Sequence, residues 1–202
     1  METEQLKIFD DHRKQIGVAT REEVHRKGYW HEAFHCWFVN DKSIYLQLRS
    51  DKKKDYPNLF DITAAGHLLS HETVQDGVRE IEEEVGIKVL FNELLPLGVI
   101  DYCITKENFI DKELANVFVY KCNLPLEHFT IHEEEVSGIV TAKFHDFSEL
   151  WFGEKETIHI KGFKIDNSGN RVILNEYVGK DHFVPHEIDF YQTVIRNIAE
   201  LL

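Results

Sequence analysis

Three glutamates in the middle of the chain are the residues best suited to do chemistry. Glu80, Glu83 and Glu84 are spaced so that an α-helix would bring all three to one face. Like charges at this spacing repel one another, and a divalent cation bound by their oxygens would offset the repulsion. Mg²⁺ or Mn²⁺ held in this way bridges to the phosphates of a substrate. A helix that is acidic only because it faces solvent is the alternative interpretation.

The residues around these glutamates predict the helix that positions them. We expect it over Thr73–Val85, with Thr73 as its N-cap and Gly86 as its stop. Arg79 lies next to the first glutamate and one turn before the second, so it can orient their carboxylates. Apolar residues recur at helical spacing on the other face: Val74, Val78, Ile81 and Val85. This pattern favours a helix anchored in the core that presents its glutamates to a site.

The segment Arg79–Ile87, REIEEEVGI, resembles the second half of the Nudix box, REUxEExGU with U aliphatic, at every defined position. The first half of the box is similar too, because Gly66 is followed by five residues and then Glu72. Six residues separate Glu72 from Arg79, whereas the family pattern has seven. We interpret the difference as a shortened loop or first helical turn. It leaves the role of Glu72 open.

The resemblance implies an α/β (α+β) fold, a Nudix-type α/β/α sandwich with a mixed sheet and a C-terminal helical extension. Residues 1–202 are then expected to form a single Nudix hydrolase domain. Its core would span about 30–148, with an N-terminal strand in 1–29 and the extension 149–202 packed on it. The alternation of strands with few strong helices agrees with this class.

The resemblance also implies an activity, that of a Nudix pyrophosphohydrolase acting on phosphorus-containing acid anhydrides. The substrate would be a nucleoside diphosphate or a related diphosphate-linked compound. Mg²⁺ or Mn²⁺ would neutralise diphosphate oxygens and activate a water whose proton a carboxylate accepts. The catalytic residues would be Glu80, Glu83 and Arg79. The metal ligands would be Glu80, Glu83 and Glu84, with a carbonyl from Ala65 or Gly66.

Basic and acidic residues outside the box are further candidates for the site. Arg49 and Lys53 are expected to bind the substrate, although a lysine run such as 52–54 can also be a solvated surface. The run Glu133–Glu135 is a candidate for a late general base on a loop, with a solvated face as the alternative. The segment Phe183–His186 resembles the C-terminal extension of isomerase-like hydrolases, and its role stays open.

Three further segments resemble the isopentenyl-diphosphate isomerase branch of the Nudix superfamily: Val24–Phe34, Ala65–His67 and Asp111–Glu113. The resemblance implies a second metal site at His25, His31, His67, Asp111 and Glu113. Three imidazoles and a carboxylate suit Zn²⁺ or Mn²⁺ better than Mg²⁺. Because the chain has 12 histidines, separate residues satisfied by backbone groups are the alternative.

Isopentenyl-diphosphate isomerase is therefore the competing activity. The isomerases carry a catalytic cysteine directly before the Gly-His pair, where this chain has Ala65. Their glutamate helix also tends to be degraded, whereas this one is complete. We therefore favour a hydrolase of the isomerase-like branch. A silent binding module with the same fold is a third hypothesis, and the intact glutamates argue against it.

Runs of β-branched and aromatic residues predict the remaining elements. Strands are expected at Gln5–Phe9, Ala33–Val39, Ser43–Arg49, Phe60–Ala64, Leu97–Thr105, Leu114–Cys122 and Gly138–His145. A hairpin is expected from Thr157–Ile165 and Arg171–Tyr177, with its turn at Asp166–Gly169. Apolar residues at helical spacing predict a closing helix: Phe190, Val194, Ile195, Ile198 and Leu201.

Composition limits the partners of the 202-residue chain. Its 23 Lys and Arg against 36 Asp and Glu give a formal net charge of -13, which disfavours duplex nucleic acid and anionic membranes. The three cysteines form no CxxC pair, the first residues are charged, and no apolar run approaches the ~20 residues of a membrane span. We expect a cytoplasmic protein that binds a small-molecule diphosphate. Formation of a homodimer stays open.

Overall fold

A long central strand, β3 (Trp30–Val39), organises the sheet. One edge of β3 pairs in parallel with β8 (Phe109–Lys121) along its whole length. The other edge pairs in turn with β1 (Gln5–Phe9), β6 (Ala64–His67) and β4 (Ser43–Arg49), all antiparallel. The sheet is therefore mixed, and the part of β3 next to β6 lies between elements that carry predicted site residues.

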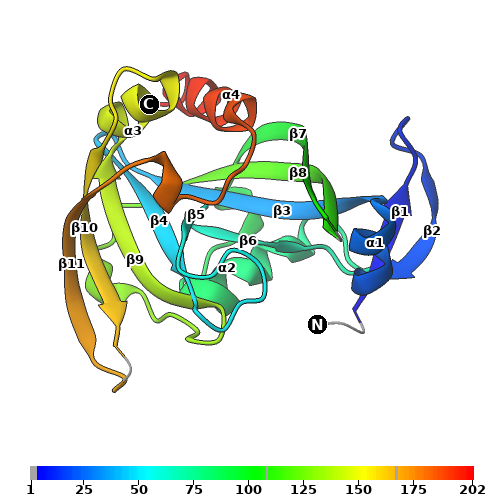
Figure 1. Cartoon of the computed structure of the whole chain (residues 1–202), viewed down its shortest axis with the longest axis horizontal. Coiled ribbons are helices and arrows are strands. Elements are labelled where there is room, and N and C mark those ends of the chain that lie inside the picture. The colour runs from blue at the N-terminus through cyan, green and yellow to red at the C-terminus, as the bar shows by residue number, and fades with distance from the viewer. Residues whose placement is uncertain (1–3, 108, 167) are drawn as a thin grey trace.

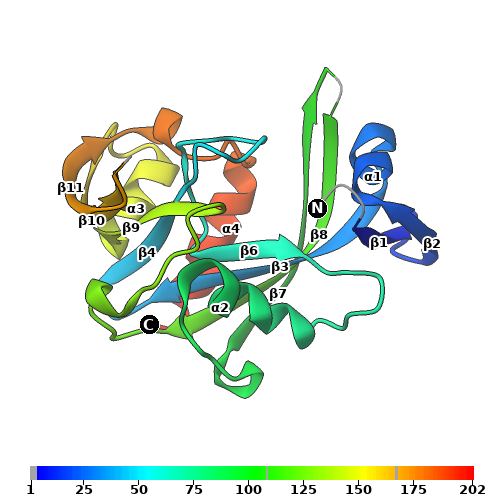
Figure 2. The ribbon, with the colours of Figure 1, turned by 90° about the horizontal axis from the view of Figure 1, so that it is seen from below.

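The remaining strands extend this sheet on both sides in the computed structural model, which describes residues 4–107, 109–166 and 168–202. Beyond β4 follow β9 (Val136–Lys143), β10 (Ile158–Ile165) and β11 (Arg171–Val178). β7 (Leu95–Lys106) pairs with β8, β2 (Gln15–Thr20) with β1, and β5 (Phe60–Asp61) with β4. Figure 2 shows β7 and β8 projecting as a hairpin beside α1 (Arg21–Lys27).

Helices cover both faces of the sheet. The side chains of β3 alternate between the two faces and therefore enter two separate cores. Trp37 points to the core shared with α3 (Phe144–Phe152) and α4 (Ile188–Ala199). Phe34 points to the core shared with α2 (Arg79–Val85). Figure 1 shows α3 and α4 on one side of the sheet and α2 on the other. The α+β class with a mixed sheet between helices is thus confirmed. Among the described helices, none is long and apolar enough to cross a membrane.

The helix that carries the glutamates begins later than expected. A 3₁₀ turn at Asp76–Val78 precedes α2, which starts only at Arg79. The cause is a local turn, because the backbone N–H and the hydroxyl of Thr73 both donate to Asp76 Oδ2, at 2.8 and 2.7 Å. Thr73 is therefore not the N-cap. The predicted stop is confirmed, because Gly86 has φ +70° and ends the helix in the left-handed conformation.

Other elements differ from the expectation at their ends or were missed. Strands at Gln5–Phe9 and Ser43–Arg49 and the late hairpin are confirmed, although Asn167 of its turn lies outside the described residues. The strand expected at Phe60–Ala64 is divided into β5 and β6, and the one expected to end at His145 ends at Lys143. Helices α1 and α3 were missed because each is short, and the strand expected to end at His145 overlapped the start of α3.

The C-terminal extension combines the expected hairpin with the expected closing helix. β10 and β11 extend the central sheet, and α4 packs on the core around Trp37. The periodic residues that predicted α4 are buried, with Leu201 beyond its end partly buried. Because strands and helix both bury apolar surface against the rest of the chain, the extension is part of the folded body.

Candidate functional site

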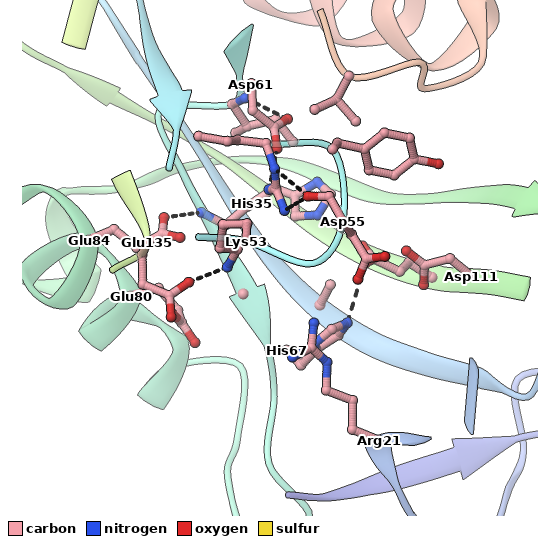
Figure 3. Close-up of a pocket in the computed structure, with 18 of the residues that line it drawn as sticks. Arg21, His35, Lys53, Asp55, Asp61, His67, Glu80, Glu84, Asp111 and Glu135 are labelled. Carbon is pink, nitrogen blue, oxygen red and sulfur yellow. Dashed lines mark hydrogen bonds and ion pairs between the residues drawn. The ribbon is translucent and has the colours of Figure 1, made fainter. Parts of the chain in front are cut away.

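A pocket of about 560 Å³ gathers nearly all the residues predicted to form the site. It lies between β3, β6, α2, the loop after β4 and the β7–β8 hairpin. Figure 3 places Glu80 and Glu84 at one side of it, Asp111 at another, and Asp61 and His35 between them. The predicted residues in its lining are Arg79, Glu80, Glu83, Glu84, Ala65, Gly66, His25, His67, Asp111, Glu113, Arg49 and Lys53. His31 is fully buried behind them.

Arg79 holds the carboxylates of the glutamate helix in place. One guanidinium nitrogen, Nη1, donates to Glu80 Oε1 at 2.6 Å and to Glu83 Oε2 at 2.9 Å. Nε and Nη2 donate to the two oxygens of Glu72, at 2.6 and 2.9 Å. A bidentate pair of this kind is strong and directional. Glu72 also accepts the N–H of Leu69 at 2.8 Å, so it anchors Arg79 to the loop despite the shortened spacing.

The loop before the helix fits closely against two of the glutamates. Glu84 is 5% exposed and accepts the N–H of Ala65 at 2.9 Å and the side-chain amide of Gln47 at 3.2 Å. A Cβ at Gly66 would lie 2.2 Å from Glu80 Cδ, so only glycine leaves room for this carboxylate. Ala65 itself contacts the helix through its backbone N–H, which donates to Glu84.

Burial changes the proton affinity of these carboxyls. It raises the pKa of Glu84 to about 8, with a further contribution from the charge of Glu80. Burial also raises the pKa of Glu80 to about 7, although Arg79 opposes the change. The side chain of Glu83, by contrast with these two, is 58% exposed to solvent. A cation near two buried carboxyls favours their ionised form, so this donor set fits a hard divalent ion.

A second group of ligands converges at the other end of the pocket. Among the described residues, one set of three or more potential ligands has all its atoms within 4.8 Å of one another: His25, His31, His67 and Asp111. His25 Nε2 and His31 Nε2 each lie 3.4 Å from Asp111 Oδ1. None of these three buried atoms makes a hydrogen bond. Two ligands of one tetrahedral zinc lie about 3.3 Å apart, so the spacing fits a shared cation.

The protonation of these histidines also fits metal binding. Burial lowers the pKa of His31 and of His67, which favours neutral imidazoles with a free lone pair. His31 Nδ1 lies 3.2 Å from the carbonyl of Tyr29, and this contact leaves Nε2 free to face Asp111. Such a second contact is typical of metal-binding histidines. Glu113 stands slightly apart, with Oε1 3.7 Å from His67 Nε2.

Four elements bring this histidine group together. His25 comes from the missed helix α1, which packs on β8, and its ring stacks on Phe109 at 4.7 Å. The parallel register of β3 and β8 places His31 beside Glu113. The antiparallel pairing of β3 and β6 brings in His67 at the end of β6.

The two predicted substrate-binding cations are both in ion pairs. Arg49 donates to Asp61 Oδ2 at 2.9 Å and to the carbonyl of Asp55. Lys53 pairs with Glu135, and both line the pocket. Of the acidic run Glu133–Glu135, the pocket lining includes Glu135 alone.

A third polar group in the pocket was missed. His35 Nε2 lies 2.9 Å from Glu113 Oε2, and His186 Nε2 lies 3.1 Å from Asp61 Oδ1. Tyr102 also lines the pocket. Strand alternation could have identified His35, because it follows His31 by four residues and shares its face. No local pattern points to the pairing of Asp61 with His186, which are 125 residues apart.

The three cysteines lie away from the pocket lining. Cys36 sits opposite Ala64 but packs into the core under α2, and burial raises its pKa. Cys122 is buried in the same core, and Cys103 on β7 is half-buried. The pocket residue before Gly66 is Ala65. The described pocket therefore offers no thiol.

Comparisons with known proteins agree with this geometry. A family model for the NUDIX domain matches residues 29–165. An uncharacterized Nudix hydrolase from Clostridium acetobutylicum is 36% identical over 209 positions, which cover 99% of each chain. An isopentenyl-diphosphate Delta-isomerase from Pectobacterium atrosepticum is 29% identical over 114 positions, 55% of this chain and 62% of its own. The crystal structure of a MutT protein from Methanosarcina mazei shares the fold, with a TM-score of 0.53 at 14% identity, covering 85% of this chain and 95% of that one. The chain belongs to the Nudix hydrolase family.

Proposed function

We propose that the protein is a divalent-metal-dependent hydrolase that cleaves the diphosphate linkage of a nucleoside diphosphate or a related compound. The observation that carries this proposal is that Arg79 and the three glutamates of α2 line one pocket. Its volume, about 560 Å³, suits a small molecule, since ligand sites span roughly 300–1,000 Å³. Membership of the Nudix hydrolase family supports the reaction class.

The chain's own residues have separate roles in this proposal. Glu80, Glu83 and Glu84 would hold Mg²⁺ or Mn²⁺, which supplies charge neutralisation for diphosphate oxygens and a more acidic water. Arg79 keeps the first two carboxylates directed to one side. Lys53 exchanges its partner Glu135 for a phosphate oxygen, and Glu135 is then free to accept a proton from water.

A substrate panel tests the activity. The purified protein is incubated with nucleoside diphosphates and with sugar-, nucleoside- and prenyl-linked diphosphates, with and without Mg²⁺ or Mn²⁺. Products are separated by chromatography. We expect hydrolysis of at least one compound that requires the metal. Absence of turnover across the panel with either ion would contradict the proposal and favour a binding module.

We also propose that His25, His31, His67 and Asp111 hold a second cation, Zn²⁺ or Mn²⁺, with Glu113 beside it. The support is the set of buried, unpaired atoms described above. In a hydrolase such an ion would position diphosphate oxygens or order the pocket. Elemental analysis of protein purified without added metal tests this site. A protein that contains no transition metal and takes up no zinc on titration would contradict it.

Isopentenyl-diphosphate isomerisation is the second candidate, because the histidine group and an isomerase relative favour it. It needs two proton-transferring groups on opposite sides of the alkene, and the pocket has Ala65 where the isomerases have their thiol. We therefore expect no isomerisation. Incubation with isopentenyl diphosphate in deuterated water provides the test. Deuterium in dimethylallyl diphosphate at enzymatic rates would overturn this choice.

A further inference from the structure

The strand β11 forms one edge of the central sheet. Among the described strands it pairs with β10 alone, and Figure 1 shows it at the outer left of the molecule. Its pairing with β10 runs over all eight residues, Arg171–Val178, without a register shift. The sequence of the strand, RVILNEYV, has neither lysine nor proline. A regular edge strand without these residues presents a row of backbone groups with which another strand can pair.

The strand at the other end of the sheet, β2, is less open to a partner. The register of β1 and β2 shifts between Ile8 and Phe9, and such an irregularity disfavours pairing with a further strand. The apolar side chains Ile16 and Val18 of β2 are about half exposed. The edge formed by β11 is therefore the better template for strand addition.

Two large apolar side chains of β11 lie in solvent. Ile173 is 81% exposed and Tyr177 is 71% exposed, the highest values for large apolar side chains among the described residues. Because they are four residues apart on a strand, they share one face. On β10, Phe163 lies beside Ile173, and His159 lies beside Tyr177 with ring centroids 5.1 Å apart. Two rows of apolar and aromatic side chains thus reach the edge of the sheet and end there.

We propose that β11 pairs antiparallel with β11 of a second copy of this chain, about a two-fold axis at Asn175. In this register Ile173 of each copy lies directly opposite Tyr177 of the other, because a two-fold axis exchanges the positions on either side of Asn175. An aromatic residue opposite a β-branched one is a favourable cross-strand pair. Each row of side chains that ends at the edge then continues on the other copy, and the two sheets become one.

Charge and spacing favour a second copy as the occupant of this edge. The net charge of -13 opposes close approach of two copies in general. The hairpin of β10 and β11 is an exception, because Ile158–Val178 has three basic and two acidic side chains: Lys161, Lys164, Arg171, Asp166 and Glu176. Two copies can therefore meet here without an excess of negative charge. A second copy also brings Ile173 and Tyr177 at the matching spacing.

Sedimentation velocity of the full chain tests the association. One strand from each copy makes a small interface, so we expect mainly monomer at about 1 µM protein and a large dimer fraction at about 100 µM. Ile173→Lys places a charge in each apolar row and should raise the dimer dissociation constant at least about 30-fold. Ile16→Lys is the matched control, because it makes the same change on the other edge strand.

The outcomes of this experiment decide for or against the interface. Ile16→Lys should dimerise like the wild type, and both variants should keep its melting temperature, since both side chains are at least half exposed. Monomer at every concentration would overturn the proposal. Dimerisation of Ile173→Lys equal to that of the wild type, or loss of the dimer in Ile16→Lys alone, would overturn it as well.

A disulfide between two copies tests the register. In Asn175→Cys the two introduced residues lie opposite each other across the axis, with Cβ atoms about 4.5–5.5 Å apart, so oxidation with diamide should join two copies. In Glu176→Cys each introduced residue lies opposite Leu174, and we expect much less cross-linking. The wild type treated in the same way controls for Cys103, which is half-buried on β7.

Non-reducing gel electrophoresis measures the cross-linked fraction. Absence of a disulfide in Asn175→Cys at about 100 µM protein, where dimers are expected, would overturn the pairing about this axis. So would equal cross-linking of Asn175→Cys and Glu176→Cys. Neither residue belongs to the pocket lining, so the result is independent of the proposed function and of the substrate panel.

Discussion

The glutamate helix and the histidine group, the two proposed cation sites of one pocket, differ in how their polar atoms are satisfied. Glu80 and Glu83 are paired with Arg79, and Glu84 with backbone and side-chain amides. In the histidine group, the Nε2 atoms of His25 and His31 and an oxygen of Asp111 are buried without hydrogen bonds. Arg79 partly balances the charges of Glu80 and Glu83 without an ion, and these two carboxylates can exchange it for a cation. An unpaired buried group is costly, so a cation bound at the histidine group would add more to stability than one bound at the glutamate helix.

The largest expected effect concerns activity at the glutamate helix. Glu83→Gln removes one charge from the proposed Mg²⁺ site while it keeps the size of the side chain. We expect kcat to fall by roughly 10²-fold or more on a substrate found with the panel. Glu82→Gln is the control, because Glu82 is exposed on the same helix and its side chain pairs with Lys88. Full activity of a folded Glu83→Gln would remove Glu83 from the site.

The metal content of the protein should show how strongly the histidine group binds a cation. His67→Ala removes one proposed ligand of the histidine group. We expect zinc affinity to fall at least about 10–100-fold, because this is the typical loss when only a residue that hydrogen-bonds to a ligand is mutated. Zinc titration followed by elemental analysis measures it. His145→Ala should retain the metal. Thermal melting in the presence of a chelator compares the two proposed sites. The wild type should lose more stability when zinc is removed than when magnesium is removed.

The pH dependence of stability distinguishes the buried carboxyl of the helix. Because the folded pKa of Glu84 is raised to about 8, metal-free wild type loses stability as pH rises from about 4.5 toward 8. Glu84→Gln cannot ionise, so we expect it to melt roughly 10 °C or more above wild type at pH 8 and equally at pH 4. Thermal melts in a chelator measure this. A variant less stable at both pH values would show that the ionised carboxylate is favourable without an ion.

Asp61, which also lines the pocket, should behave in the opposite sense. Its folded pKa is lowered to about 2, so the ionised form stabilises the protein above about pH 4 and this contribution disappears as pH falls toward 2. Asp61→Asn should cost about 2 kcal/mol of unfolding free energy at pH 6. Chemical denaturation at pH 6 and at pH 3 measures it, and we expect a smaller cost at pH 3. An equal cost at both would contradict the ionic pairing with His186 and Arg49.

The elements that sequence predicted well are those with a contiguous pattern. The Arg79–Ile87 segment indicated its helix face and its stop, because helical spacing is local. The start of the helix was wrong, because Thr73 forms a turn with Asp76 that competes with capping. Predicted strands were right where turn residues bounded them, as at Ser43–Arg49. Short helices such as α1 carry too few turns for a period to be recognised.

For this chain, sequence alone determined the family, the glutamate helix and the residues that carry the two proposed cation sites. These follow from residue types at short, regular separations, which the geometry of a helix or strand converts directly into shared faces. Only the tertiary structure decided that His25 on α1 meets Asp111 on β8, and that His186 meets Asp61 across 125 residues. Such long-range contacts depend on strand register and on the packing of the C-terminal extension. Both are determined by how the whole chain buries its apolar surface.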